Sequence, residues 1–71
     1  MTYTIIDCRE GAGGNTLATP ARSPEHAAKV ALGLDLFRSG VRNHMVCRVY
    51  WEQDGQRNMV RLYSQSRHPV A

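Results

Sequence analysis

The sequence contains few residues that could cross-link the chain and no segment that could hold it in a membrane. Its two cysteines, Cys8 and Cys47, are too few for a disulfide framework. No apolar run is long enough for a secretory signal or a membrane span. These absences predict a cytoplasmic protein that has no membrane partner and keeps its thiols reduced, and a Cys8–Cys47 bridge is the less favoured alternative.

Motifs for chemistry are also scarce. The cysteines, together with His26, His44 and His68, match none of the paired spacings of zinc sites. The glycine-rich stretch Gly11–Gly14 has Thr16 where a dinucleotide fingerprint needs its third glycine, and the expected helix starts well downstream, so we interpret it as a turn. Since 71 residues leave little room for a substrate pocket of about 300 Å³, we expect no cofactor, no metal and no enzymatic activity.

What the chain does have is a composition suited to one small folded domain. Its hydrophobic content of 42% argues against disorder. A chain of 71 residues buries only about 60% of its unfolded surface, so its core is thin. Small domains of this kind often gain the missing stability by self-association. We predict a single domain over residues 1–71, with an ordered core at about 2–64 and a flexible tail at 65–71.

The residue pattern predicts an α+β fold with the element order ββαββ. Residues 2–8 are β-branched and aromatic enough for a first strand, and residues 15–19 return as a second. Ser23, Pro24 and Glu25 form a helix start, and the expected helix runs from Pro24 to Arg38 and stops at Ser39-Gly40. Residues 44–52 and 57–64 form a second hairpin that turns at Asp54-Gly55. The result is an antiparallel sheet with one helix packed on one face.

Helical periodicity divides the apolar residues of this segment into two groups. The expected core face holds Ala27, Val30, Leu34 and Phe37. Leu32 and Leu36 fall on the opposite side, where the sheet cannot cover them. They are exposed, covered by the tail, or in contact with a partner or a second copy, and they are the candidate contact of a homodimer.

The positive charge is concentrated in the second half of the chain. Residues 1–41 hold four basic and four acidic residues, whereas residues 42–71 hold five arginines against two acidic residues, which accounts for the net charge of +3. Eight of the nine basic residues are arginine, the residue best suited to bidentate contact with phosphate or carboxylate. A GC-rich genome would also favour arginine and explains the composition equally well.

The Asp54-Gly55 turn sets the register of the second hairpin and sorts its side chains onto two faces. The expected core face holds Met45, Cys47, Val49, Trp51, Val60 and Leu62. The other face holds Val46, Arg48, Tyr50, Met59, Arg61 and Tyr63. Arg48 and Arg61 stand directly opposite each other, which costs stability and therefore suggests a use outside folding.

These residues form the candidate partner-binding site. We assign it to Arg48, Tyr50, Arg61 and Tyr63, with Arg57 and Arg67 at the rim. A cationic and aromatic sheet surface suits an acidic protein or nucleoprotein complex, and it also suits nucleic acid. A third interpretation is that these arginines and tyrosines only cover the sheet surface and bind no partner. A one-residue slip in register would move the whole set to the other face.

A short chain that begins in a strand and places one helix between two hairpins resembles some small phage-encoded anti-CRISPR proteins. The resemblance covers residues 2–64 and consists of element order and size. It implies a non-catalytic inhibitor that binds a nucleoprotein complex. Our leading hypothesis is such an inhibitor, and the alternative is a direct nucleic-acid-binding module or small transcriptional regulator that uses the same face.

Overall fold

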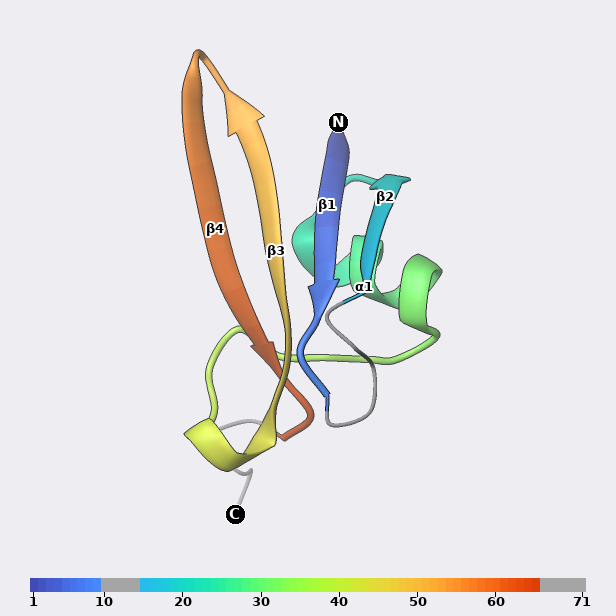
Figure 1. Cartoon of the computed structure of the whole chain (residues 1–71), viewed down its shortest axis with the longest axis vertical. Coiled ribbons are helices and arrows are strands. Elements are labelled where there is room, and N and C mark those ends of the chain that lie inside the picture. The colour runs from blue at the N-terminus through green and yellow to red at the C-terminus, as the bar shows by residue number, and fades with distance from the viewer. Residues whose placement is uncertain (10–14, 66–71) are drawn as a thin grey trace.

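The computed structural model describes residues 1–9 and 15–65 and contains the predicted order of elements. Two strands, β1 (Thr2–Asp7) and β2 (Thr16–Pro20), precede the helix α1 (Pro24–Leu32). A short 3₁₀ turn, η1 (Arg42–His44), then leads into β3 (Met45–Gln53) and β4 (Gln56–Tyr63) (Figure 1). The α+β class and the ββαββ order are confirmed. The glycine-rich loop and the tail with Arg67 lie outside the described residues.

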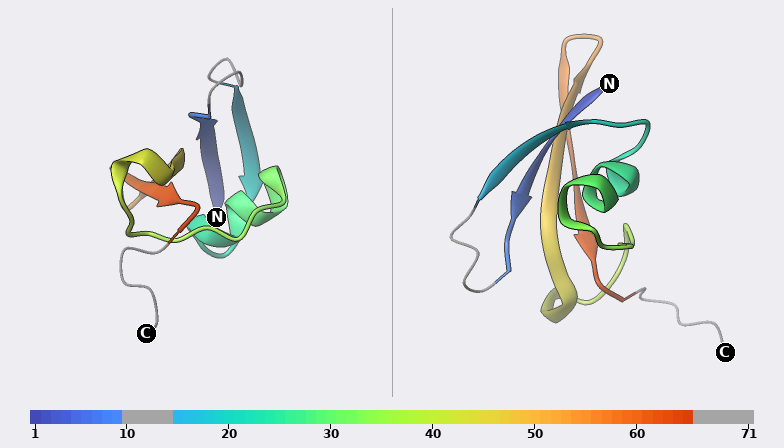
Figure 2. Two further views of the ribbon diagram at one scale, coloured as in Figure 1. Left: turned by 90° about the horizontal axis from the view of Figure 1, so that it is seen from below. Right: turned by 90° about the vertical axis from the view of Figure 1, so that its right-hand side faces the viewer.

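The four strands form one antiparallel sheet in the order β2-β1-β3-β4. Strands β1 and β3 are central, and β2 and β4 lie at the edges. The pairing of β1 with β3 joins the first hairpin to the second. Helix α1 packs on one face of this sheet, mainly against β1 and β2, and Figure 2 shows it on that side. No helix among the described residues is long and apolar enough to cross a bilayer.

The helix begins as predicted and ends early. Ser23 is the N-cap, with its Oγ accepting a hydrogen bond from the His26 backbone N–H, and Pro24 takes the first helical position. Gly33 ends the helix because it adopts the left-handed conformation, with φ 73°, and its N–H bonds the Lys29 carbonyl. The predicted end at Arg38 was therefore wrong, since the first available glycine acts as the cap.

The early end changes which residues reach the core. Ala27 and Ala28 are buried, whereas Val30 is 57% exposed and does not belong to the core face as predicted. Leu36 is only 7% exposed because the chain after Gly33 turns it inward. Phe37 is exposed, and its backbone pairs with Tyr63 beside β4.

The predicted dimer contact consequently loses its basis. Leu32 is half-buried against the core, and Leu36 lies within the core itself, so the two leucines do not form an exposed helical stripe. The chain's own side chains cover Leu36 and part of Leu32.

The register of the second hairpin is confirmed from its turn to Cys47. Asp54 and Gly55 both have positive φ, 53° and 77°, as a two-residue turn of this kind requires. Arg48 pairs with Arg61, and Tyr50 pairs with Met59. A β-bulge then shifts the pairing, so Tyr63 faces Met45 rather than the predicted Val46. Val46 and Met45 were therefore assigned to the wrong faces, since the bulge buries Val46 beside Cys47 and places Met45 with Tyr63.

The buried core fills the space between the sheet and α1. Within it the rings of Tyr3 and Trp51 lie 5.5 Å apart in a tilted arrangement. Its largest fully buried side chains come from the two central strands and β4. The core consists of Tyr3, Ile5, Ala27, Ala28, Leu36, Val46, Cys47, Val49 and Leu62.

Gly40 gives a test of how the segment after α1 is held. A Cβ at this position would lie 2.6 Å from the Tyr63 Cβ and 2.6 Å from the Gln65 carbonyl oxygen. We therefore expect Gly40→Ala to lower the free energy of unfolding by about 1–3 kcal/mol, the usual cost of overpacking. Urea unfolding measures the change. The control Ser39→Ala, at an exposed neighbour, should stay within about 0.5 kcal/mol, and equal effects of both variants would contradict the close approach.

Candidate binding face

The sheet face opposite α1, here called the open face, has no described element packed across it. Because directly paired residues share a face, the strand registers define its rows of side chains. The first row across the sheet holds Thr16, Ile6, Arg48 and Arg61, and the second holds Ala18, Thr4, Tyr50 and Met59. The face is thus cationic and aromatic on β3 and β4 and small or apolar on β1 and β2.

Arg48 and Arg61 lie next to each other, and no carboxylate among residues 1–9 and 15–65 forms an ion pair with either. The ion pairs among the described residues involve Arg9, Lys29 and Arg38 instead. The Nε atom of Arg48 is buried and has no hydrogen-bond partner there. Contact with the Cys8 thiol and then with Tyr50 raises the pKa of Arg48, so this guanidinium stays charged.

Arg57 lies beside Tyr50 on the same face. Its guanidinium carbon is 4.8 Å from the centre of the Tyr50 ring, a cation–π contact, and its Cα partner is Glu52. One side of the Tyr50 ring is therefore covered within the protein. Arg57, predicted for the rim, thus has an aromatic ring and an acidic cross-strand neighbour, whereas Arg48 and Arg61 are paired with each other.

Tyr63 lies at the other end of the face, where the bulge and the segment after α1 meet. The close approach of Gly40 fixes its position. Here the chain forms an open groove of about 660 Å³. We call it the arginine groove, and it is lined by Gly40, Arg42, Met45, Arg48, Arg61 and Tyr63.

The structure brings together three of the predicted site residues in the arginine groove and adds Arg42 to them. Arg48 and Arg61 share the groove with Tyr63, while Tyr50 and Arg57 line a second hollow beside Met1 and Thr2. Arg42 was missed because its place depends on η1 and on the bulge, for which the sequence holds no clear signal.

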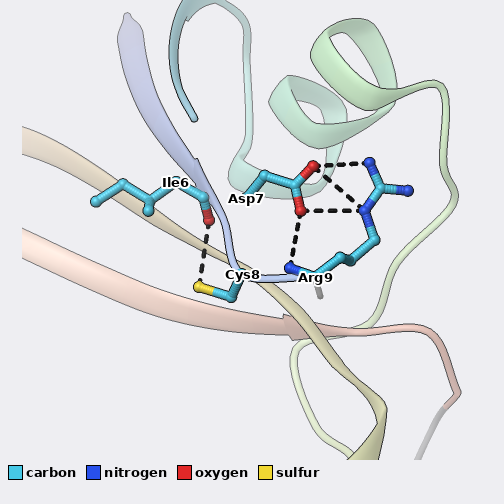
Figure 3. A network of polar contacts seen from close by, with 4 residues as sticks. All are labelled: Ile6, Asp7, Cys8 and Arg9. Atoms are coloured by element: carbon cyan, nitrogen blue, oxygen red, sulfur yellow. Dashed lines mark hydrogen bonds and ion pairs between the residues drawn. The ribbon is translucent and has the colours of Figure 1, made fainter. Parts of the chain in front are cut away.

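The two thiols face different surroundings. Cys47 is fully buried, and loss of hydration raises the pKa of its thiol to about 11. Cys8 is half-buried, and its Sγ donates a hydrogen bond to the Ile6 carbonyl at 3.5 Å (Figure 3). Both are free thiols. Among residues 1–9 and 15–65 no three His, Cys, Asp or Glu side chains gather as metal ligands would.

Asp7 is a buried carboxylate that serves the fold. Arg9 satisfies it completely, because the Arg9 backbone N–H and guanidinium all donate to its oxygens (Figure 3). The shortest of these contacts, from Nη2 to Oδ2, is 2.7 Å. These hydrogen bonds lower the pKa of Asp7. Arg9 is thus engaged in an ion pair and does not contribute a free charge to the open face.

No family model matches the chain, and no match was found among curated proteins or solved structures. The arrangement of its own residues is the guide to its function.

The Arg48–Arg61 pair predicts a gain in stability when one charge is removed. We expect Arg61→Thr to raise the free energy of unfolding by a few tenths to about 1 kcal/mol at low salt, because like charges directly opposed repel. Salt should shrink the gain. Arg57→Thr is the matched control, since it removes an arginine paired with Glu52 and Tyr50 and should destabilise the hairpin instead. A loss of stability in Arg61→Thr would mean that Arg61 supports the fold.

The Asp7–Arg9 pair predicts the behaviour in acid. A carboxyl whose folded pKa is lowered stabilises the fold above its unfolded pKa of about 3.9 and loses that effect as pH falls through the folded value. Urea unfolding from pH 7 to pH 2 should therefore show stability falling below about pH 4. Asp7→Asn should be less stable than wild type at pH 7 and should lose less stability as the pH falls. Asp35→Asn, in an exposed ion pair, should change neither the stability at pH 7 nor its loss in acid.

Proposed function

We propose that this protein is a non-catalytic binding protein whose open face holds an acidic surface of a partner protein. The main observation behind this proposal is the adjacent pair of Arg48 and Arg61, which has no ion-pair partner and no covering element within the described part of the chain. Such a pair costs stability in the free protein. An acidic group placed between the two guanidinium groups would remove that cost and gain charge-assisted hydrogen bonds.

The rest of the face supports a protein as the partner. Ile6 and Met59 add apolar surface beside the arginines, and a mixture of apolar centre and charged rim is typical of protein interfaces. Arginine and tyrosine are also enriched among the residues that contribute most to binding. Base stacking, by contrast, needs open rings, and Arg57 already covers one side of Tyr50.

Within this class we favour an inhibitor of a nucleoprotein complex. This choice rests on the similarity of size and element order to small anti-CRISPR proteins, together with the basic face. Such a protein would bind an acidic patch on one subunit and obstruct it. A face of this sign does not imitate DNA, so the inhibitor would act by covering a surface of the complex.

The second candidate is a nucleic-acid-binding module that uses the same face. The observation that favours it is the number of arginines gathered there, namely Arg42, Arg48, Arg57 and Arg61. Phosphate contacts would make its affinity fall log-linearly with salt concentration, more steeply than that of an interface with an apolar centre.

A pull-down from host lysate tests the proposal. Wild type and Arg48→Ala/Arg61→Ala are compared with and without nuclease. We expect a protein partner that survives nuclease and is lost in the double variant, because both unpaired charges are gone. The matched control is Arg22→Ala/Lys29→Ala, which removes two positive charges outside the open face and should keep the partner.

Circular dichroism and urea unfolding decide how a loss of binding is interpreted. A folded double variant without partner supports the proposed function. Unfolding of the double variant would show that the arginines are structural and would contradict it. Recovery that depends on nucleic acid would replace the proposal with the second candidate.

A further inference from the structure

Three separate parts of the chain contribute arginines to the arginine groove. Arg42 comes from η1, Arg48 from β3 and Arg61 from β4. They meet because Arg48 and Arg61 are directly paired, while the segment after α1 returns to Tyr63 and places η1 beside them. A groove assembled from such distant residues depends on the whole fold and differs from a chance run of basic residues.

The lining carries positive charge and no carboxylate. Its six residues include three guanidinium groups and a tyrosine hydroxyl, and none of the three arginines has an ion-pair partner among the described residues. The buried Nε of Arg48 adds a hydrogen-bond donor without an acceptor. Because this atom is closed to solvent, a ligand in the groove would be held by the terminal nitrogen atoms of the guanidinium groups.

The number of donors indicates the class of acceptor. A carboxylate presents two oxygens and is matched by one arginine in bidentate contact. A phosphomonoester carries nearly two negative charges and three free oxygens, which suits several guanidinium groups at once. Met45 and the ring of Tyr63 add an apolar wall that would contact the carbon atoms next to the phosphate.

We propose that the arginine groove binds a phosphomonoester group on a side chain of the partner protein. This inference rests on the proposed function and names the group that the open face recognises. A protein-borne group fits better than a small free ligand, because the groove is open and adjoins the rest of the open face. It also fits better than nucleic acid, whose backbone diesters carry one charge each.

Direct titration tests the site with defined probes. O-phosphotyrosine and inorganic phosphate are added to the ¹⁵N-labelled protein, with tyrosine as the unphosphorylated control. We expect phosphotyrosine to shift the backbone amides of residues 40–48 and 61–63 and tyrosine to leave them unchanged. Binding should strengthen as pH rises through about 6, where the second phosphate proton is lost.

Variants at Arg42 show whether the groove itself is responsible. Arg42→Ala should weaken phosphotyrosine binding roughly tenfold, the usual effect of one charge-assisted hydrogen-bonded contact. Arg42→Lys keeps the charge and loses the planar fork, so it should restore only part of the affinity. Arg22→Ala, an exposed arginine outside the groove, should bind as wild type does.

Three results would overturn the inference. One is the absence of shifts at residues 40–48 and 61–63, and another is equal binding of phosphotyrosine and glutamate. The third is tighter binding of a single-stranded oligonucleotide without terminal phosphate, which would assign the groove to diesters.

The pull-down separates this inference from the proposed function. If Arg42→Ala and treatment of the lysate with a phosphatase both leave partner capture intact while Arg48→Ala/Arg61→Ala abolishes it, the open face binds a partner without a phosphate subsite. If phosphotyrosine binds the groove but no partner is captured, the groove stands as a phosphate site and the proposed function fails.

Discussion

The pairing of β1 with β3 is the contact on which the rest of the structure depends. It joins two hairpins that are far apart in sequence, and its centre is the fully buried pair Ile5 and Val49. Two-stranded hairpins are marginal in isolation, so this pairing gives the sheet enough width to hold a core. The same register places Ile6 beside Arg48 and Thr4 beside Tyr50, so it also builds the open face.

The open face follows from the small size of the protein. One helix of nine residues covers one side of the sheet, mainly over β1 and β2, and the described chain has no second layer for the other side. An antiparallel sheet tolerates this arrangement when its second face is polar. Here that face holds two directly opposed arginines, and a local conflict of this kind is typical of functional surfaces.

Much of the fold could be predicted because local signals agreed with it. The Asp54-Gly55 turn determined the pairing back to Cys47, and Ser23-Pro24 marked the start of the helix. The helix end was missed because Leu34 and Phe37 continue the helical spacing of Ala27 and Val30. The alternation of Leu34, Asp35 and Leu36 fits extended chain equally well. The bulge at Val46 was missed because three successive apolar or small residues, Met45 to Cys47, give no sign of which one is extra.

The features that the sequence concealed are the ones that complete the candidate site. Because α1 ends at Gly33, the next residues are free to return to β4, where Phe37 pairs with Tyr63. That return brings Gly40 against Tyr63 and places η1, with Arg42, beside the paired arginines. A helix that continued to Arg38 would have kept this segment on the far side of the sheet. The early end of the helix therefore converts two opposed charges on a sheet into a groove lined by three.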